Sequence, residues 1–417
     1  MKFELGFGTG TQTVTVPDRN VLSVLKPNEV KTALTGRAAV KDALEHPIGS
    51  LRLREIVKPG EKIVLIASDI TRPCPTWEIM PHLLSELYDA GAEKKDITLV
   101  FGLGSHRKMT DEERRHLAGE QAYSEIRCMD GDCSDCVHLG VTKSKTPVDI
   151  VRTVAEADRR ICIGNIEYHY FAGYSGGAKA IMPGVSTPAA IQSNHSMMVR
   201  EGAHTGKIDG NPVREDIEEA GKMCGIDFIL NVVLNEKKEI IRAVAGDAVK
   251  AHREGCRFLD TLYLIRIPHR ADIVIVSDGG APKDLNLYQT QKALDNSRHA
   301  VKKGGTVILV GSCKEGLGQK TFEEWMRKAE KPEDLIFRIK ENFTLGGHKA
   351  AAIAMVEQNA EVDLVSEMPD ELVKTCFMKP YHDVQAAFDQ AFRKYGEDAE
   401  VIIMPYGGST LPETEKE

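Results

Sequence analysis

Side chains that can bind anions or move protons follow three short apolar segments of the chain. Asp69 and Arg72 come after the first segment, and His106 comes after the second. His169 follows the third segment, at the start of a glycine-rich stretch. Ligands of open α/β sheets bind outside the carboxyl ends of the strands. We therefore expect these four side chains to meet at one edge of a sheet.

Each of these residue types suits a small anionic substrate. The planar guanidinium of Arg72 can bind a carboxylate through two hydrogen bonds, and Asp69 can hold that guanidinium or a ribose hydroxyl. Imidazole titrates near neutral pH, so His106 and His169 can each take or give a proton. A reaction that inverts a stereocentre needs such a group on each face. The alternatives are a surface ion pair and ordinary turn histidines.

The segment 173–179 has the composition of an anion-binding loop. Glycines reach positive φ and allow successive backbone N–H groups to point at a phosphate. The segment is not a Walker A motif, because Ala178 precedes Lys179 and Ala180 follows it. A tight turn with an exposed lysine is the alternative. The residues expected to bind a cofactor here are Gly173, Tyr174, Ser175, Gly176, Gly177 and Lys179.

Two further groups are candidates with weaker signals. His195 is a candidate metal ligand, because neutral imidazole binds transition metals. Tyr288 and Lys292 are four residues apart and would share one helical face, with Gln289 beside them. A structural histidine and a solvated helix face explain the same residues.

Cys128, Cys133 and Cys136 form a cluster in a chain that has nine cysteines. Their spacing matches part of a plant-type [2Fe–2S] pattern, with Cys162 as the fourth ligand. Cys162 falls in an expected buried strand, where cysteine commonly serves as a small apolar residue. Free thiols in an acidic loop are therefore the favoured interpretation, and the role of the cluster stays open.

The elements that must position these residues alternate between apolar β-branched runs and segments of helical period. This alternation is typical of an α/β fold with mainly parallel sheets flanked by helices. The expected strands are 62–67, 97–101, 160–164 and 227–234 in one sheet, and 272–277, 306–310, 362–366 and 400–404 in another. The expected helices include 247–265, 289–303 and 383–394, and residues 2–16 are expected to form a hairpin.

A chain of 417 residues exceeds what one hydrophobic core usually supports, so we expect two α/β domains. Domain 1–268 would carry the cofactor and the catalytic residues, and domain 269–404 would close over the substrate. The tail 405–417 is expected to pack back on the first domain. The active site would then lie in the cleft between the domains.

The composition excludes several classes of protein. With 42% hydrophobic and 28% charged residues, the chain is typical of a globular protein. A net charge of −8 argues against a broad nucleic-acid surface. The sequence has neither a long apolar run nor a signal-peptide pattern. We expect a cytoplasmic protein without a nucleic-acid or membrane partner, and the oligomeric state is left open.

Together, the motifs resemble those of the nickel-dependent lactate racemase family. The resemblance covers essentially the whole chain, and the segment 168–184 is the most specific part. The motifs that occur in the family's order are Asp-x-Thr-Arg-Pro at 69–73, Gly-x-His-Arg at 104–107, Tyr-His-Tyr-Phe-Ala-Gly-Tyr-Ser-Gly-Gly-Ala-Lys at 168–179, Asn-His at 194–195 and Tyr-Gln-x-x-Lys at 288–292.

The resemblance implies a nickel-pincer nucleotide, which is a pyridinium-3-thioamide-5-thiocarboxylic acid mononucleotide joined to Lys179 as a thioamide. Nickel would be held by the two sulfurs and a ring carbon, with His195 as the fourth ligand. Such an approximately square-planar set agrees with the geometry that Ni(II) prefers. Asp69 would sit in the same site. The partners implied are proteins that make the cofactor and insert nickel.

The same resemblance makes His106 and His169 the paired acid/bases of a 2-hydroxyacid racemase or epimerase. One histidine would take the hydroxyl proton while the Cα hydrogen passes to the cofactor as hydride, which gives a planar 2-oxo acid. Return of the hydride to the other face inverts the centre. The implied contacts of the small anionic 2-hydroxy acid are Arg72, Gln289, Lys292, Tyr288 and His348.

One departure from the family concerns the substrate. Where the lactate enzyme has a tryptophan in the second domain, this chain has Gly346-Gly347-His348-Lys349. These residues would open or polarise the pocket, so a larger or more polar 2-hydroxy acid is at least as good a candidate as lactate. Two other functions are a phosphate-binding transferase that uses 173–179 and a non-catalytic nickel- or cofactor-binding protein. The latter would not need both histidines.

Overall fold

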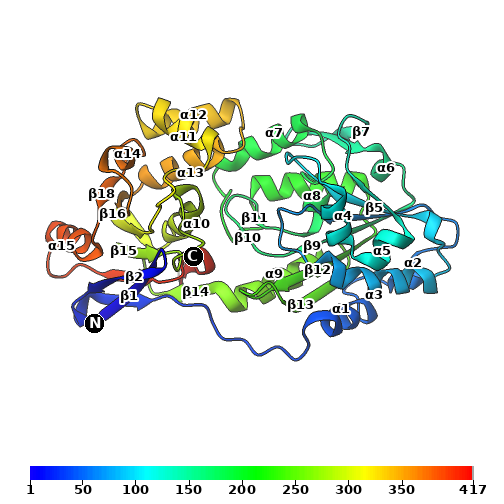
Figure 1. Ribbon diagram of the computed structural model, residues 1–417, viewed down its shortest axis with the longest axis horizontal. Helices are drawn as coiled ribbons and strands as arrows, with labels where there is room; N and C mark the ends of the chain where they lie inside the picture. The colour runs from blue at the N-terminus through cyan, green and yellow to red at the C-terminus, as the bar shows by residue number, and fades with distance from the viewer. Residues whose placement is uncertain (416–417) are drawn as a thin grey trace. The chain divides into compact units, whose positions relative to one another are not determined.

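The computed structural model describes residues 1–415, which form two compact units (Figure 1). The large unit is Val30–Asp260. The small unit combines Met1–Glu29 with the chain from Thr261 onward. In the part of the chain that is described, no helix has the length and apolar character needed to cross a membrane.

The large unit is built on a six-stranded sheet with the order β13-β12-β9-β4-β5-β6. Only β13 is antiparallel to its neighbour. The four strands expected in the first sheet are confirmed to within one residue at each end. The strands are β4 (Ile63–Ser68), β5 (Ile97–Gly102), β6 (Arg127–Asp130), β9 (Arg159–Asn165), β12 (Phe228–Leu234) and β13 (Ile240–Gly246).

Apolar side chains fix the sheet between two layers. On one face, Leu65, Leu99 and Ile161 lie in a core with residues of the helices, such as Leu83 of α3. On the other face, the short helix η3 (Gly177–Ala180) contacts β9 and β4. Each buried apolar side chain contributes about 1.5–3 kcal/mol. Since a one-residue slip would expose this set, the core holds the strands in register and aligns their carboxyl ends.

Nine helices and two short hairpins complete the described part of the large unit. The predicted helix 247–265 is observed as α9 and is followed by a strand. The helices are α1 (Gly36–Glu45), α2 (Leu53–Ile56), α3 (Thr76–Asp89), α4 (Asp111–Ala118), α5 (Glu120–Glu125), α6 (Arg152–Ala155), α7 (Pro188–Ser196), α8 (Pro212–Cys224) and α9 (Lys250–Tyr263). The hairpins are β7 (Cys136–Val141) with β8 (Pro147–Val151), and β10 (Tyr168–His169) with β11 (Gly173–Tyr174).

The small unit contains a second six-stranded sheet, which is wholly parallel, with the order β18-β17-β16-β15-β19-β3. Each of the four strands expected here is present. The strands are β3 (Val21–Val24), β15 (Ala271–Ser277), β16 (Val301–Val310), β17 (Glu361–Val365), β18 (Lys379–Tyr381) and β19 (Val401–Met404). The helices are α10 (Leu287–Ser297), α11 (Lys320–Lys328), α12 (Pro332–Glu341), α13 (Gly347–Glu357), α14 (Asp370–Lys374) and α15 (Val384–Tyr395).

Helix α10 is shorter than the predicted helix 289–303. It ends at Ser297, and the chain enters β16 at Val301. Gly304 and Gly305 follow, and Gly304 has a φ of 79°. Both glycines lie inside β16, after the helix has ended, so they do not set its end.

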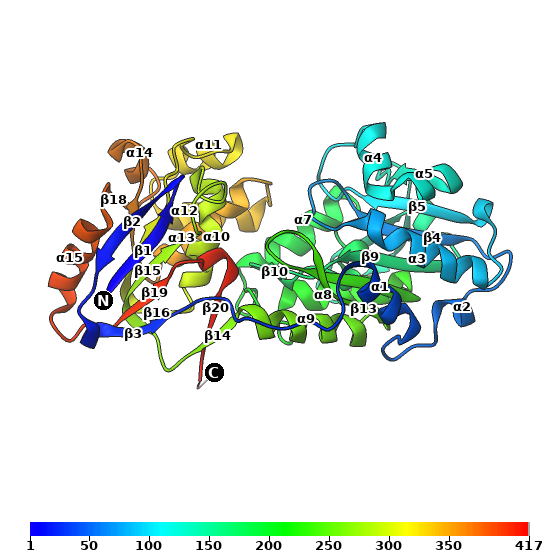
Figure 2. The same cartoon turned by 60° about the horizontal axis from the view of Figure 1, so that its bottom comes forward.

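The N-terminal segment belongs to the small unit, although the sequence analysis assigned it to a domain 1–268. The predicted hairpin 2–16 is confirmed as β1 (Lys2–Phe7) and β2 (Gly10–Thr15), and β3 pairs with β19 (Figure 2). The tail, expected to pack on the first domain, also joins the small unit, because β20 (Leu411–Thr414) pairs with β14 (Leu264–Ile267). Of this tail, residues 416 and 417 lie outside the described residues.

The hairpin supplies core residues to the small unit, so a cavity there should destabilise it. Leu5 is 0% exposed and packs in one cluster with Ile275 and Val310. We expect Leu5→Ala to lower the free energy of unfolding of this unit by about 2–5 kcal/mol. Chemical denaturation of the Trp77→Phe background, followed by the fluorescence of Trp325 in the small unit, measures this change.

The matched control for this experiment is Leu51→Ala, because Leu51 is 63% exposed. Its substitution should leave the denaturation midpoint in place. A midpoint that Leu5→Ala also leaves unchanged would contradict the assignment of the hairpin to this core.

Candidate functional site

Adjacent parallel strands place Asp69 beside His106. Asp69 follows β4 and His106 follows β5, and these strands pair in parallel along their whole length. The Asp69 Oδ2 atom lies 2.7 Å from His106 Nδ1. Thr71 donates to the other carboxylate oxygen from its hydroxyl group at 2.6 Å and from its backbone N–H at 3.2 Å. Within residues 1–415, no ion pair joins Asp69 to Arg72, so the surface-pair alternative is not what the structure contains.

The protonation of this pair follows from its hydrogen bonds. Burial of Asp69 opposes ionisation, but hydrogen bonds with His106 and Thr71 outweigh it and lower the pKa of the carboxyl. An ionised carboxylate only accepts hydrogen bonds, so His106 donates from Nδ1. The lone pair of the neutral ring is then on Nε2, which can accept a proton.

His169 lies in the hairpin that follows β9, and β9 pairs with β4 on the side opposite β5. It pairs with Gly173 across the hairpin, and its Nδ1 accepts a hydrogen bond from the backbone N–H of Ala172 at 3.3 Å. The proton of the neutral ring is therefore on Nε2. Burial, followed by the charges of Lys179 and Arg72, lowers the pKa of His169 well below its usual range. The ring is neutral at neutral pH.

Arg72 is exposed and its backbone N–H donates to Asp69 O at 3.1 Å. Its positive charge contributes to the lowered pKa of both His169 and Lys179. Arg72 therefore lies near enough to both residues to disfavour their protonated forms by charge repulsion. A cation that is exposed to solvent here is available to an anionic ligand.

The glycines of the segment 173–177 allow close packing. Gly173 has a φ of 75°, and an added Cβ would lie 2.0 Å from Lys207 O. The backbone N–H of Gly177 donates to Asn231 Oδ1 at 2.8 Å, and that of Ser175 donates to Glu167 O at 2.8 Å. These N–H groups are directed into the protein, so the interpretation of the segment as an open nest for a phosphate was wrong for both positions. The predicted role of these residues in cofactor binding stays a prediction.

Two tyrosines anchor the hairpin to α9. The hydroxyl of Tyr174 donates to the carboxylate of Asp260 at 2.7 and 2.9 Å, and that of Tyr168 donates to Oδ1 at 2.8 Å. Ser175 adds a hydrogen bond from its hydroxyl to Asn165 O at 2.7 Å. The loop that leads to Lys179 is therefore fixed on both sides.

Lys179 lies in η3 and is partly buried, which differs from the alternative of an exposed lysine in a turn. Burial and the charges of Arg214 and Arg72 lower the pKa of Lys179 well below its usual range, against the opposing charge of Glu167. A lysine amine that has lost its proton has a free electron pair and is a nucleophile, whereas a protonated amine is not.

His195 is 8% exposed and is oriented by its neighbour in α7. Asn194 donates from Nδ2 to Asp216 Oδ2 at 2.7 Å and to Val213 O at 3.2 Å, so its Oδ1 faces His195 Nδ1 at 2.8 Å. His195 therefore donates from Nδ1 and carries its lone pair on Nε2. Metal-binding histidines commonly have this arrangement, with an outer carbonyl that fixes the tautomer.

Phe171 lies at the centre of these groups. Its ring centroid is 4.5 Å from that of His169 and 5.0 Å from that of His195, and both contacts are edge-on. The Nζ atom of Lys179 lies 6.0 Å from the same ring centroid. The structure thus brings together three predicted site residues around one buried aromatic ring.

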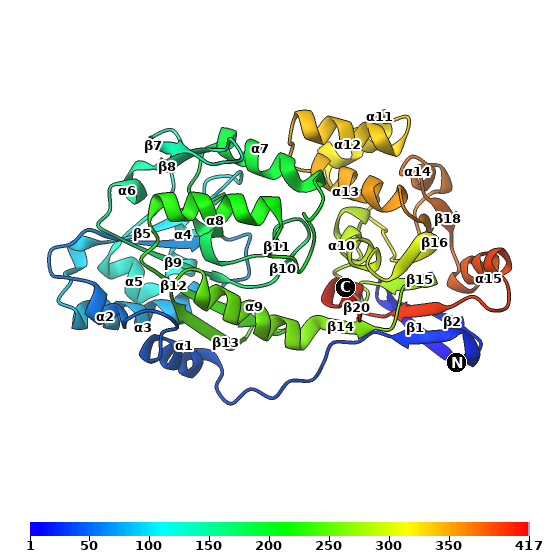
Figure 3. The ribbon, with the colours of Figure 1, turned by 180° about the vertical axis from the view of Figure 1, so that it is seen from behind.

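The sequence analysis missed the residues that support this cluster. Arg214 is 0% exposed and donates from Nε to Ala172 O at 3.2 Å and from Nη2 to Tyr174 O. Figure 3 shows α7 and α8 beside the β10–β11 hairpin. The sequence Asn211-Pro212 does signal a helix start, but an arginine in a first turn is usually exposed, so no local pattern indicated its burial.

On the small unit, α10 carries three predicted substrate contacts on its first turns. Asn286 caps the helix by accepting from Gln289 N at 3.1 Å. Gln289 and Lys292 are exposed and Tyr288 is partly buried, as expected for one helical face. Their contact with substrate stays a prediction.

His348 and Lys349 of the small unit are buried. Burial and the charge of Lys349 lower the pKa of His348 to about 3, and its Nδ1 accepts from Gly346 N at 2.9 Å. The Nζ atom of Lys349 lies 4.2 Å from the ring centroid of Tyr288. The contact of His348 with substrate stays a prediction.

The cysteine cluster has no metal-binding arrangement. Across residues 1–415, no three His, Cys, Asp or Glu side chains are grouped as ligands of one ion. Burial raises the pKa of Cys128 and Cys136 to about 11, and Cys133 Sγ donates to Ser186 O at 3.2 Å. Cys162 is buried in β9. The raised pKa values keep Cys128 and Cys136 protonated at neutral pH, and the role of the cluster stays open.

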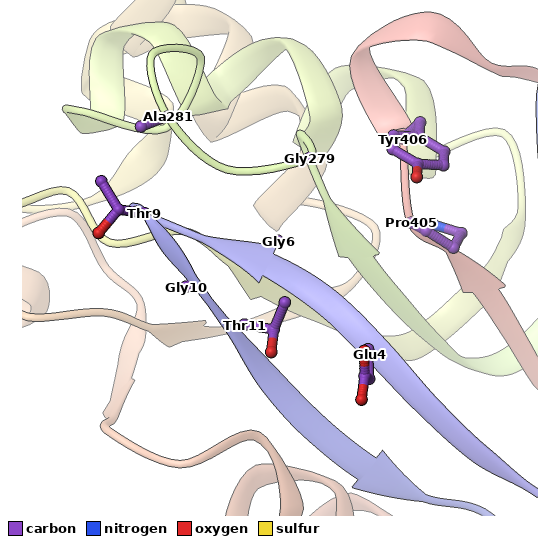
Figure 4. Close-up of a pocket in the computed structure, with 10 residues that line it drawn as sticks. Glu4, Gly6, Thr9, Gly10, Thr11, Gly279, Ala281, Pro405 and Tyr406 are labelled. Atoms are coloured by element: carbon purple, nitrogen blue, oxygen red, sulfur yellow. The ribbon is translucent and has the colours of Figure 1, made fainter.

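A hollow of about 430 Å³ lies in the small unit under the N-terminal hairpin (Figure 4). It is bordered by Glu4 and Thr11 on the hairpin and by Gly279 and Tyr406 after two strands of the sheet. None of the predicted site residues borders it. Apart from Glu4, its walls carry no charge.

Comparisons with known proteins find matches to both units of the chain. The family model described as lactate racemase N-terminal domain matches residues 7–206, and the one described as lactate racemase C-terminal domain matches residues 267–411. Lactate racemase from Thermoanaerobacterium thermosaccharolyticum is 31% identical over 98% of each chain. Lactate racemase from Lactiplantibacillus plantarum is 31% identical over 97% of this chain and 98% of that protein.

A solved structure supports the same relationship. The lactate racemase apoprotein from Thermoanaerobacterium thermosaccharolyticum aligns with a TM-score of 0.87 and 30% identity, over 99% of this chain and 100% of that chain. A protein from Thermotoga maritima aligns with a TM-score of 0.60 and 17% identity over 91% and 97%, and shares the fold. The alignments with the lactate racemases therefore include both units of this chain. The chain therefore belongs to the lactate racemase family of isomerases.

Proposed function

We propose that this protein is a racemase or epimerase of a small 2-hydroxy acid and uses a nickel-pincer nucleotide attached to Lys179. The observation that carries the proposal is the cluster around Phe171, which combines a nucleophilic amine, a histidine with its lone pair on Nε2 and a second, neutral histidine. The relatives named lactate racemase support the reaction class.

The residues fit an anionic, metal-binding nucleotide. The lowered pKa of Lys179 suits formation of a thioamide, which requires an unprotonated amine. Nε2 of His195 would be the protein's ligand to nickel. Arg214 Nη1 is buried without a hydrogen-bond partner among the described residues, and with Arg72 it makes the surroundings positive. When bound, the cofactor would supply a hydride acceptor for the Cα hydrogen of the substrate.

Two histidines with different protonation would serve the hydroxyl group. His106 presents the lone pair of Nε2 and has Asp69 behind it, so it can take the hydroxyl proton and hold the resulting charge. His169 presents an N–H on Nε2 and can donate a hydrogen bond from it to the substrate oxygen. To give a proton it would have to be in the imidazolium form, because inversion through a planar 2-oxo acid needs a base on one face and a charged acid on the other, and the roles exchange in the reverse direction.

Arg72 would bind the substrate carboxylate. Its side chain is exposed, and its charge acts on His169 and Lys179. A guanidinium binds a carboxylate through two parallel hydrogen bonds, which also orients the neighbouring hydroxyl-bearing carbon. On this proposal, Arg72 sets the position of the substrate and the histidines move its proton.

The two alternative functions are less well supported. A phosphate-binding transferase would need backbone N–H groups of 173–177 directed at a ligand, and those of Ser175 and Gly177 donate inside the protein. A non-catalytic binding protein would not need an Asp–His pair of the kind that Asp69 and His106 form.

The first experiment measures inversion directly. The protein is produced with the cofactor-making enzymes, incubated with a panel of enantiopure 2-hydroxy acids that includes lactate and larger or more polar acids, and assayed by chiral chromatography. We expect both enantiomers to appear from at least one acid, and only with cofactor-loaded protein. If loaded protein inverted none of the panel, the proposed reaction would be wrong.

Intact mass and metal analysis should separate attachment from metal binding. Wild-type protein should carry an adduct that Lys179→Ala lacks, because the amine is the point of attachment. His195→Ala should keep the adduct and lose nickel, since a covalent bond survives removal of one metal ligand. An adduct mapped to another lysine would overturn the first assignment, and equal nickel in His195→Ala would overturn the second.

Substitution of each histidine in turn should show which enantiomer it serves. His106→Asn and His169→Asn keep size and some hydrogen bonding but remove proton transfer, so racemisation should fall by roughly 10²–10⁴-fold. Each variant should still form 2-oxo acid from one enantiomer in a single turnover, followed by absorbance and product analysis. The preferred enantiomer should differ between the variants. Identical responses to both enantiomers in both variants would refute the division.

A further inference from the structure

The first turn of α8 holds the backbone of the segment at the centre of the site. Asn211 Nδ2 donates to Phe171 O at 2.9 Å. Arg214 donates to Ala172 O and Tyr174 O, the carbonyls on either side of Gly173. Three of the four carbonyls from 171 to 174 are therefore fixed by side chains of a single helical turn.

The same turn also supports the candidate nickel ligand. Val213 O and the carboxylate of Asp216 accept both hydrogen bonds from the Asn194 amide, which in turn orients His195. Thr142 donates to the other carboxylate oxygen of Asp216. Two parts of the site that are distant in sequence thus depend on five consecutive residues of α8 and its cap.

Arg214 brings a positive charge into this turn without an acidic partner. It is 0% exposed, and in residues 1–415 no ion pair joins it to a carboxylate. Glu218, which lies one helical turn further along α8, is bound by Arg253 at 2.7 Å. A buried guanidinium that has only neutral carbonyl partners is costly to keep. Its retention beside the site therefore indicates a role beyond packing.

We propose that Arg214 is a positioning residue, whose guanidinium fixes the backbone on both sides of Gly173 and whose buried charge makes Lys179 a nucleophilic amine at neutral pH. This inference rests on the proposed attachment of the cofactor at Lys179. In that step, the lone pair of Nζ forms a bond to the thiocarboxyl carbon and the C–O bond breaks. The oxygen takes the electron pair, accepts a proton from the nitrogen and leaves as water.

Helix α8 packs against η3, which carries Lys179, and after burial itself Arg214 is the charge that lowers the pKa of Lys179 most. Burial, Arg214 and Arg72 lower the pKa of Lys179, and Glu167 opposes them. Arg72 is exposed, so solvent screens its effect, whereas the charge of Arg214 acts through the protein interior. An isolated lysine is protonated at pH 7 and has no lone pair to offer.

The two histidines beside the loop, His169 and His252, are neutral. Burial lowers the pKa of His169 and of His252 well below the usual range, so neither adds a positive charge at neutral pH. His252 Nε2 lies 2.8 Å from Ser175 O and donates to it. Removal of Arg214 would therefore leave no other buried cation to replace it among these groups.

Amine labelling tests the inference without the cofactor. Full-length protein made without the cofactor-making enzymes is treated with trace acetic anhydride from pH 5 to 11, and acetylation of Lys179 is followed by peptide mass spectrometry. The midpoint of the pH profile reports the amine itself and does not depend on reagent access. We expect a midpoint for Lys179 far below that of Lys222, which is exposed on α8, the helix that carries Arg214.

Two substitutions separate charge from hydrogen bonding. Arg214→Gln removes the charge, so the Lys179 midpoint should rise by about 1–3 pH units, and labelling at pH 7 should fall about tenfold for each unit. Arg214→Lys lacks the fork and can lose its proton in this buried position, so the Lys179 midpoint should lie between those of wild type and Arg214→Gln. Because it lacks the fork, it should also speed hydrogen exchange in the peptide that contains 172–174. Arg253→Gln is the control, since its charge is already paired with Glu218.

The outcomes distinguish this inference from the proposed function. Equal midpoints in wild type and folded Arg214→Gln, checked by thermal unfolding, would sink the inference even if the cofactor adduct forms. A low Lys179 midpoint together with the absence of any adduct would contradict the attachment and leave the effect of Arg214 standing. If Arg214→Gln does not fold, the result rests on the wild-type midpoint. A wild-type midpoint equal to that of Lys222 contradicts the inference.

Discussion

The hydrogen bonds from the first turn of α8 to the backbone around Gly173 are the interaction on which the site depends. Through them, the hairpin that carries His169, the loop that carries Lys179 and the helix that carries His195 share one support. A loop alone would not hold these groups, because its flexibility would spread their positions. Rigid support of this kind keeps reacting groups in place at little further entropic cost.

The electrostatics of the site follow from that support. Arg72, Lys179, Arg214 and His169 are close enough to influence one another, and like charges at short range in a buried site cannot all be present. The groups that can lose a proton therefore do so, and the arginines keep their charge. The outcome is a neutral histidine and a neutral lysine beside fixed cations, which suits an anionic ligand. Asp69, in contrast, stays ionised because its two hydrogen-bond donors outweigh its burial.

The sequence predicted most of the strands because they are short apolar runs that polar residues and glycines interrupt. The candidate site residues could be chosen because they directly follow those runs. The contact of Asp69 with His106 follows from the pairing of the two strands that precede them. It could not predict that β3 pairs with β19, since those residues are separated by almost the whole chain. Nor could it show that Asn231, from a distant strand, accepts the N–H of Gly177. The buried state of Arg214 depends on two carbonyl groups, those of Ala172 and Tyr174, brought near by folding, and no local pattern encodes it.

The small unit is discontinuous in sequence, and this has a consequence for the order of assembly during synthesis. The large unit, Val30–Asp260, is one uninterrupted stretch that emerges from the ribosome before the last strands of the other sheet exist. Domains generally fold as units while the chain is made. Residues 1–29 must therefore wait for their partners: β1 can pair with β2, but β3 has no neighbour in the sheet until β19 has been made. A nascent chain at that stage has a complete large unit, while the core of the small unit is still open.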